Sequence, residues 1–161
     1  MSLKMVISGG QTGADQGGLL GTHDSGLRTG GTAPKGWRTE AGAAPWLANF
    51  GLVESDSISY SARTRANVEA ADGTVLFGDP KSKGSKLTEQ YCNDCGKLLL
   101  HIPYSGERPD VDYTARTLAN WLQQHRVDVL NVAGNRESGN PGIGDYVRQV
   151  ISRTLVFLRD L

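Results

Sequence analysis

Three glycine-rich or polar segments contain residue types that could bind an anion. They read SGGQTGADQGG (8–18), GDPKSKGSKLTE (78–89) and AGNRESGNPGIGD (133–145), and each lies between a short apolar run and a helical pattern. Backbone N–H groups at the start of a helix carry partial positive charge and suit a phosphate. Glycine lets the backbone approach a ligand closely. Lys81, Lys83, Lys86 and Arg136 could add positive charge. The pattern therefore indicates binding of a phosphate or another anion.

Standard catalytic and nucleotide motifs are missing from the sequence. Neither G-x-x-x-x-G-K-[ST] nor a G-x-G-x-x-G after the first apolar run occurs, which disfavours P-loop ATP hydrolysis and standard NAD binding. No nucleophile elbow or Ser/His/Asp set stands out. The single C-x-x-C pair, Cys92 and Cys95, lacks further metal ligands and is interpreted as two reduced thiols. We therefore expect no catalytic set and no metal site. For Asp15 the sequence leaves two alternative interpretations: it binds the ligand, or it only interacts favourably with the dipole of its helix.

The elements that would position these segments alternate along the chain. Near-continuous apolar runs at 5–8, 74–77, 98–102 and 127–132, with a weaker one at 27–33, are typical of strands buried on both faces of a parallel sheet. Helical patterns cover 13–25, 61–71 and 86–95, and two apolar stripes run from 111 to 122 and from 143 to 158. The order predicts an α/β fold, a Rossmann-like open, mainly parallel sheet with helices on both faces.

In such a sheet, ligands bind at the carboxyl ends of the strands, so the three segments should converge at one edge. We expect the irregular stretch 34–60 to be a long functional loop or flap. We also expect Gly10→Val to abolish ligand binding and leave the chain folded, because a side chain would block close approach of the backbone.

Length and charge narrow the functional class. A chain of 161 residues suggests a single domain. Its 17 basic and 17 acidic residues show no basic excess, which disfavours nucleic acid and membrane surfaces as partners. The sequence has no apolar run of about 18 residues that could span a membrane. Because the start also lacks a long apolar signal core, we expect a cytoplasmic protein.

Five ordered motifs carry a resemblance to a known family. They are SGGQTGAD, GGTAPKGWRTEAG, YSARTRANVEAADGTVLF, GSKLT and LNVAGNRESGNPGI. Over about residues 5–150 the chain resembles the molybdenum carrier proteins, a circularly permuted branch of the superfamily of LOG-type phosphoribohydrolases and DNA processing protein A. The resemblance implies a Rossmann-like fold and non-catalytic binding of a nucleotide-like or pterin-phosphate ligand. Its first candidate is molybdenum cofactor, whose own dithiolene holds the metal. It also implies a homo-oligomer, either dimer or tetramer, with molybdoenzymes as recipients.

The resemblance places the ligand contacts on the shared motifs. They are Gly9, Gly10, Gln11, Thr12, Gly13, Asp15, Lys35, Gly36, Arg63, Thr64, Asn67, Gly84, Ser85, Thr88, Gly134, Arg136, Glu137 and Ser138. The chain departs from the family pattern at Gln16 and Gly17, where Arg and Ala are more usual, and at Asn135, where proline is more usual.

Two alternative functions stay open at this stage. One is hydrolysis of the N-glycosidic bond of a nucleoside monophosphate, with Asp15, Glu89 and Glu137 as the nearby acids. The phosphoribohydrolases resemble P-G-G-x-G-T-x-x-E, and Glu89 does not match the spacing of its glutamate. The other alternative is a sensor of nucleotide-derived ligands.

Overall fold

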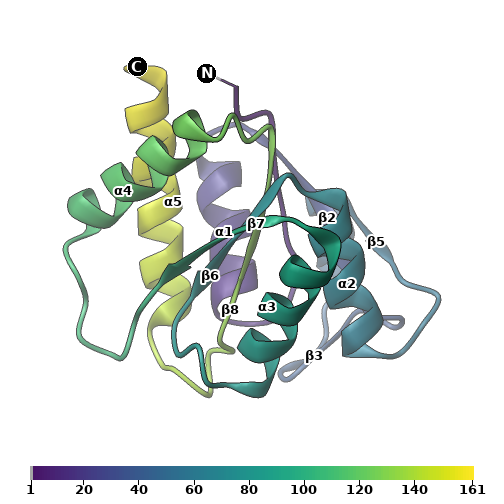
Figure 1. The fold of residues 1–161 in the computed structure, drawn as a ribbon. Coiled ribbons are helices and arrows are strands. Elements are labelled where there is room, and N and C mark those ends of the chain that lie inside the picture. Colours follow the sequence, from purple (N-terminus) through teal and green to yellow (C-terminus); the bar gives the residue numbers. More distant parts are fainter. Residues whose placement is uncertain (1) are drawn as a thin grey trace.

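A six-stranded parallel sheet forms the centre of the protein in the computed structural model, which describes residues 2–161. The strand order is β5-β2-β1-β8-β6-β7 (Figure 1). The strands are β1 (Met5–Ile7), β2 (Arg28–Ala33), β5 (Leu52–Glu54), β6 (Gly73–Phe77), β7 (Leu98–Ile102) and β8 (Val129–Gly134). Every neighbouring pair in this sheet is parallel. This confirms the predicted α/β, Rossmann-like fold.

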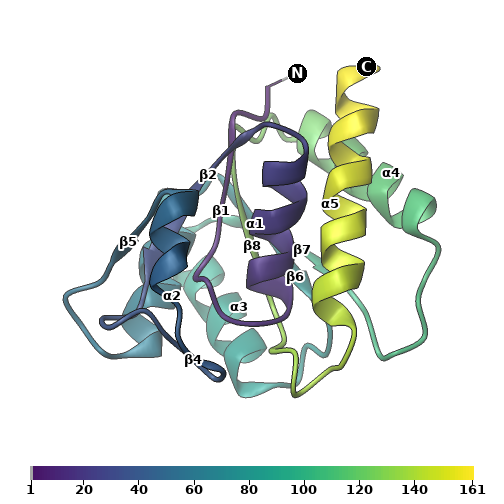
Figure 2. The same cartoon turned by 180° about the vertical axis from the view of Figure 1, so that it is seen from behind.

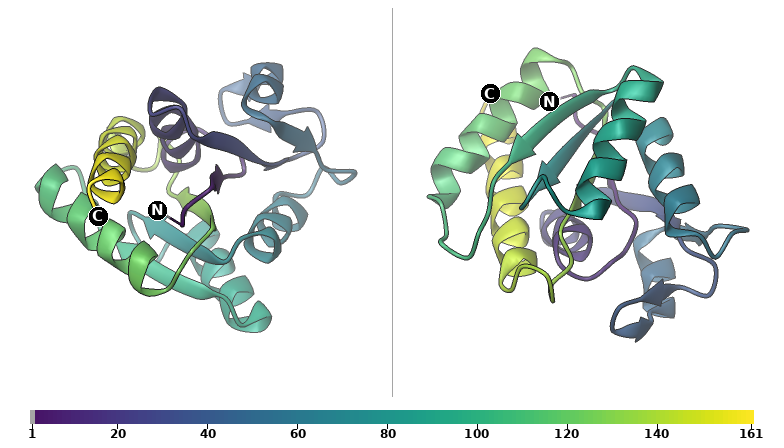
Figure 3. Two further views of the ribbon diagram at one scale, coloured as in Figure 1. Left: turned by 90° about the horizontal axis from the view of Figure 1, so that it is seen from above. Right: turned by 60° about the horizontal axis from the view of Figure 1, so that its bottom comes forward.

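Helices cover both faces of the sheet, as right-handed crossovers between parallel strands require. One face carries α1 (Ala14–Asp24), α4 (Val111–Gln124) and α5 (Ile143–Arg159), and the other carries α2 (Tyr60–Ala70) and α3 (Lys83–Cys95). Figure 2 shows α1 and α5 side by side, and Figure 3 shows the layers from above. The stripes predicted from 111 to 122 and from 143 to 158 are the buried faces of α4 and α5.

Helix α1 lies unusually close to α5 because small residues face the contact. A Cβ atom on Gly17 would lie 2.4 Å from the carbonyl oxygen of Gly144, and one on Gly21 would lie 2.5 Å from that of Arg148. Glycine at these positions therefore lets the backbones of α1 and α5 pack directly against each other. The main core lies between these helices and the sheet, and its members include Val6, Phe77, Leu118, Leu130, Tyr146 and Ile151.

Residues 34–60 are more ordered than the sequence indicated. A short hairpin of β3 (Arg38–Thr39) and β4 (Gly42–Ala43) leads to the 3-10 helix η1 (Pro45–Phe50) and then to β5. Strand β5 pairs with β2 at the edge of the sheet, an edge that the sequence prediction missed. A second apolar cluster, Leu19, Ala33, Ala44, Leu47 and Leu52, holds this segment against α1 and β2. We call residues 34–59 the flap.

Two boundaries differ from the prediction for local reasons. Helix α3 begins at Lys83, three residues before the predicted start at 86, because the Ser82 hydroxyl caps it by accepting a hydrogen bond from the Ser85 N–H at 3.2 Å. The last strand spans 129–134 and not 127–132. Within residues 2–161, no helix combines the length and the apolar character needed to cross a membrane.

Candidate functional site

The three anion-binding segments meet at one edge of the sheet. Strands β1, β8 and β6 are neighbours, so the turns that follow them lie together at the lower edge in Figure 1, which comes forward in the right panel of Figure 3. A cavity of about 450 Å³ lies there and is lined by residues of all three turns and of helix α2. Convergence of the turns was the central prediction from the sequence, and the structure shows it.

Asn135 ties the three turns together. Its backbone N–H donates to the Phe77 oxygen at 3.2 Å, and its backbone oxygen accepts from the Ala14 N–H at 3.1 Å. Its side-chain oxygen accepts from the Asp79 N–H at 2.6 Å, and its side-chain amide donates to the Ser82 hydroxyl at 3.1 Å. A proline at this position could supply none of the N–H donors. The departure from the family pattern at Asn135 is thus the point where the turns after β1, β6 and β8 are joined.

A buried ion pair forms one wall of the cavity. The Arg63 Nη1 atom lies 2.9 Å from the Asp15 Oδ2 atom, and the two side chains are only 11% and 6% exposed. The same oxygen accepts the Gln11 N–H at 3.2 Å. Burial raises the pKa of Asp15, and the charge of Arg63 is the largest effect opposing that rise. Asp15 thus holds Arg63 in place, which makes it more than a residue favourable to the α1 dipole.

Positive charge gathers around one aromatic ring at the cavity. The guanidinium carbons of Arg38, Arg63 and Arg136 lie 5.4, 5.5 and 5.2 Å from the centre of the Tyr60 ring. Each distance is within cation–π range. Because the three side chains come from the flap, α2 and the β8–α5 turn, their charges converge only in the folded chain.

The first turn of α3 contributes the opposite wall. Ser82, Lys83 and Gly84 line the cavity, and the first N–H groups of a helix have no partner within it. The Lys83 side chain adds a positive charge at the same place. Ser82 already accepts the Ser85 N–H, so the N–H groups of Lys83 and Gly84 are the ones left to an anion. Together with the positive end of the helix dipole and a cation, they are the elements of an anion site.

The flap is fastened to the site through Glu40. Its carboxylate accepts hydrogen bonds from the hydroxyls of Thr12 and Ser138, and from the Ser138 N–H at 3.1 Å. These hydrogen bonds lower the pKa of Glu40, that from the Ser138 hydroxyl most. The Glu40 N–H in turn donates to the Gln11 Oε1 atom at 2.9 Å. The predicted flap therefore lies against the β1–α1 and β8–α5 turns.

Most of the residues expected to contact the ligand line this cavity. They are Gly9, Gln11, Asp15, Arg63, Thr64, Asn67, Gly84, Thr88, Gly134, Arg136 and Ser138. Asn67 does so with its amide already engaged, since it donates to the Thr32 oxygen at 3.0 Å and accepts from the Thr32 N–H at 2.9 Å. These two hydrogen bonds hold helix α2 against strand β2 and so fix the position of this wall of the cavity.

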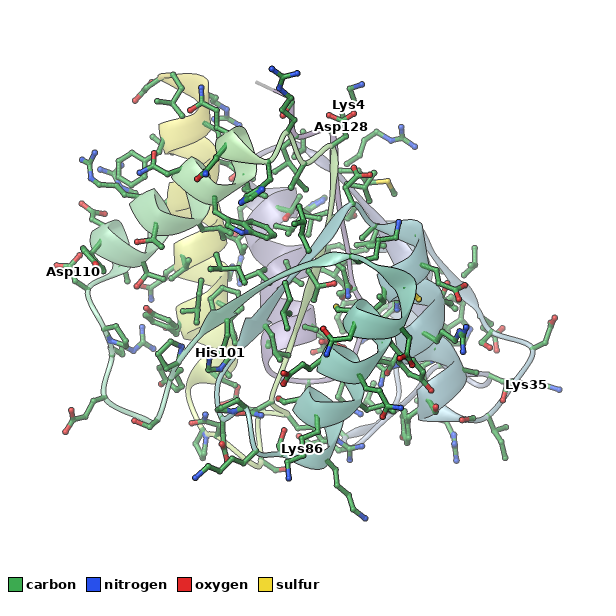
Figure 4. All side chains as sticks on the ribbon, viewed as in Figure 1. Lys4, Lys35, Lys86, His101, Asp110 and Asp128 are labelled. Atoms are coloured by element: carbon green, nitrogen blue, oxygen red, sulfur yellow. The ribbon has the colours of Figure 1, made fainter. Side chains whose placement is uncertain are left out.

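The remaining expected contacts lie elsewhere. Thr12, Gly13 and Glu137 border a second hollow between α1, α5 and Glu40. Ser85 is buried behind the α3 turn and approaches the Asn135 amide at 3.5 Å. Lys35 and Gly36 lie on the flap, where Figure 4 shows Lys35 on the outer side of the molecule.

Gly10 points away from the cavity. With a φ of 78°, its added Cβ would lie 2.6 Å from Leu47 Cδ1, inside the second apolar cluster. At Gly9, in contrast, an added Cβ would lie 1.8 Å from Arg63 Nη1. Gly9 is therefore the glycine that gives Arg63 its room, and Gly10 is needed for packing.

The carboxylates proposed for hydrolysis are not gathered in the cavity. Glu137 caps α5, accepting the Gly142 N–H at 2.6 Å and the Gly144 N–H at 3.0 Å. Thr88 lines the cavity, whereas Glu89, the next residue, is not among the lining residues. Within residues 2–161, no group of three or more His, Cys, Asp or Glu side chains is arranged to hold a metal ion.

Lys83, expected as a positive charge beside the second turn, lines the cavity. Several other lining residues were not predicted: Tyr60, Asp79, Ser82, Leu87, Asn131, Ala133, Asn135 and Gly139. Some had a signal in the sequence. Tyr60 opens one of the five family motifs, and Asn131 is a polar residue inside an apolar strand. Leu87 has none, because an apolar residue in a helical stripe is indistinguishable from a core residue.

Comparison with known proteins supports one family. A model described as the circularly permutated YpsA SLOG family matches residues 6–155. Among solved structures, a crystal structure of a "Putative molybdenum carrier protein" from Syntrophus aciditrophicus SB superposes with a TM-score of 0.86 at 34% sequence identity. The match covers 96% of each chain. No curated protein matches the sequence.

The packing of Gly10 generates a prediction. We expect Gly10→Val to lower the stability of the fold by about 1–3 kcal/mol or more, through overpacking and a positive φ unsuited to a branched residue. This replaces the expectation of a folded chain that has only lost its ligand. Thermal and urea unfolding will measure the effect, and a Gly10→Val protein as stable as the wild type would contradict the packing role.

The buried ion pair generates a second prediction. Arg63→Gln removes the charge that opposes the raised pKa of Asp15, so the pKa rises further above its unfolded value. Below the unfolded pKa the carboxyl is neutral in both states and costs nothing. Relative to the wild type, the loss of stability therefore begins above the folded-state pKa of the wild type and grows up to the still higher folded-state pKa of the variant. It then levels off at about 3–5 kcal/mol, where the lone carboxylate is charged.

Unfolding measured between pH 4 and pH 8 checks this effect. The control is Arg65→Gln, two residues along α2, whose ion pair with Glu69 is half exposed. It should cost less than about 1 kcal/mol at any pH. A pH-independent loss in Arg63→Gln, or no recovery in the Asp15→Asn/Arg63→Gln double variant, would contradict the assignment.

Proposed function

The chain belongs to the circularly permutated YpsA SLOG family, and we propose that it acts as a non-catalytic binding protein for a phosphate-bearing heterocyclic ligand. The observation that carries the proposal is the meeting, in one cavity, of the α3 N-terminus with Lys83, Arg63 and Arg136. Our first candidate for the ligand is molybdenum cofactor. That choice is supported by the name of the similar protein from Syntrophus aciditrophicus.

The phosphate is assigned to the α3 side of the cavity. There the N–H groups of the first helical turn can donate to phosphoryl oxygens, and Lys83 and Arg136 can neutralise their charge. The space beside Gly84 is open, because a Cβ at that position would meet no atom within 4 Å. The anion would thus replace the water that otherwise solvates these donors.

The heterocycle is assigned to the opposite side, between Tyr60 and the β1–α1 turn. A cavity of about 450 Å³ falls in the range of small-molecule sites, roughly 300–1,000 Å³. Its side chains there are polar and fixed by hydrogen bonds, which suits a flat ring with several donors and acceptors. In this arrangement the metal of a molybdenum cofactor stays on the dithiolene of the cargo itself.

Hydrolysis of a nucleoside monophosphate is a weaker reading of the same cavity. Such chemistry needs a carboxyl group free to donate or accept a proton. Glu137 is occupied in capping α5, and Asp15 is paired with Arg63. Asp79 also lines the cavity, with one oxygen accepting the Lys81 N–H at 2.9 Å. Binding without turnover therefore agrees better with the hydrogen bonds of the site.

The resemblance also leads us to propose self-association as a dimer or tetramer, a cytoplasmic location and molybdoenzymes as recipients of the cargo. Exposed apolar side chains at Trp46, Val53 and Ile58 give the flap side a surface suited to contact with another protein. Sedimentation velocity on the purified chain tests self-association, and a monomer at micromolar concentration would contradict it.

The carrier role leads to a binding test. Apo-protein is incubated anaerobically with molybdenum cofactor released from a molybdoenzyme, and retained pterin is measured after gel filtration. We expect saturable binding at micromolar protein and protection of the cofactor from oxidation. Arg136→Ala should weaken binding by about tenfold to a hundredfold, the value of a lost charge-assisted hydrogen bond.

The matched control is Arg108→Ala, which removes an exposed arginine paired with Asp145 outside the cavity. It should bind the cofactor like the wild type. Absence of saturable binding would refute the carrier role. Release of free base from any nucleoside monophosphate, lost in Glu137→Gln, would instead favour the hydrolase.

A further inference from the structure

Two buried N–H donors in the wall of the cavity have no partner within residues 2–161. They are the Gln11 Nε2 and the Arg63 Nε. Gln11 is 6% exposed. A buried donor without an acceptor costs about 1–3 kcal/mol. Such groups are rare in folded proteins, and each one needs a physical reason.

The orientation of the Gln11 amide is fixed by its other atom. Gln11 Oε1 accepts the Thr12 N–H at 3.0 Å and the Glu40 N–H at 2.9 Å. Both partners are backbone donors, so exchanging the oxygen and nitrogen positions would place donors against donors. Nε2 therefore carries the two hydrogens, and these have no acceptor in the protein.

The two unmatched donors belong to one corner of the site. The Gln11 N–H and the Arg63 Nη1 both donate to the same oxygen, Asp15 Oδ2. Gln11, Asp15 and Arg63 also line the cavity. We call this part of the site the Asp15 corner. It has two hydrogen-bond donors that lack acceptors within residues 2–161.

We propose that the Asp15 corner selects a lactam-type heterocycle, one that presents a ring carbonyl oxygen to Gln11 and Arg63. This inference rests on the proposed function and specifies the class of its ligand. Pterins, guanine and hypoxanthine have such a carbonyl, whereas adenine has an amino group in its place. An amino group would face Gln11 Nε2 with a further donor and leave both unsatisfied.

The corner is also coupled to the flap. Gln11 Nε2 and Arg63 Nε are buried and have no acceptor within residues 2–161, so in this proposal the carbonyl oxygen of the ligand supplies the acceptor that both lack. Gln11 links the flap to the cavity. Its Oε1 atom accepts the Glu40 N–H of the flap, and its Nε2 atom has no acceptor in the described part of the protein. Recognition of the carbonyl and attachment of the flap therefore depend on the same side chain.

The test compares inosine 5′-monophosphate, whose lactam has a carbonyl on carbon 6 and a hydrogen on N1, with adenosine 5′-monophosphate, which has an amino group on carbon 6 and no hydrogen on N1. Equilibrium dialysis against the wild-type chain should show inosine monophosphate bound at least about tenfold more tightly, as expected for one unmatched donor. Gln11→Glu keeps an oxygen for the Thr12 and Glu40 N–H groups and removes the donor. It should lower or reverse the preference.

Gln16→Glu is the matched control. It makes the same chemical change in the same turn, at a side chain that donates to the Gly10 oxygen at 3.0 Å and does not line the cavity. It should keep the wild-type preference. Thermal unfolding of both variants shows whether they fold, and the wild-type comparison decides the matter if Gln11→Glu does not.

Equal binding of the two nucleotides would overturn the lactam inference and leave the proposed function standing. So would binding of molybdenum cofactor that is unchanged in a folded Gln11→Glu protein. If inosine monophosphate, adenosine monophosphate, inorganic phosphate and molybdenum cofactor all fail to bind, the proposed function fails together with the inference.

Discussion

One side chain, Asn135, holds the binding edge together. Parallel strands bring the turns after β1, β8 and β6 to the same side of the sheet, but adjacency alone does not fix their spacing. The Asn135 amide bonds to Asp79 and Ser82, and its backbone bonds to Phe77 and Ala14. With the turns joined in this way, the α3 N-terminus, Arg136 and the β1–α1 turn face a common space. The cavity is therefore a consequence of a polar cross-link between loops.

The cavity combines saturated and unsaturated polar groups. The cavity-lining side chains of Asp15 and Asn67 make hydrogen bonds within the protein, as do Glu40 and Glu137 behind the cavity, and these bonds fix the walls. The N-terminus of α3 and the side chains of Gln11 and Arg63 have N–H donors without an acceptor in the described part of the protein. Rigid walls with spare donors favour tight binding of an acceptor-rich anion, since little ordering remains to be done when it arrives. Asp15 is engaged by Arg63 and Glu137 by the start of α5, so neither is free for proton transfer in this arrangement.

The sequence predicts the architecture of this site better than its detail. Buried apolar runs indicate a parallel sheet, and from that alone the three turns must share an edge. The choice between Gly9 and Gly10 was beyond sequence reasoning, because it depends on whether Arg63 or Leu47 lies opposite each Cβ. Strand β5 was missed because three residues at an edge carry no periodic pattern. Glu137 looked like a candidate acid until its two N–H partners in α5 were visible.

The first described residues and the end of helix α5 lie together at the top of Figures 1 and 2, whereas the turns that line the cavity lie at the lower edge. The site depends on which strands are neighbours in space and not on the order in which the chain visits them. Joining the ends and opening the chain at a surface loop that does not line the cavity would thus leave the walls of the cavity in place. The order of the elements along the chain could therefore change while the walls of the cavity stay the same. This is the physical condition under which circularly permuted chains can share one binding edge.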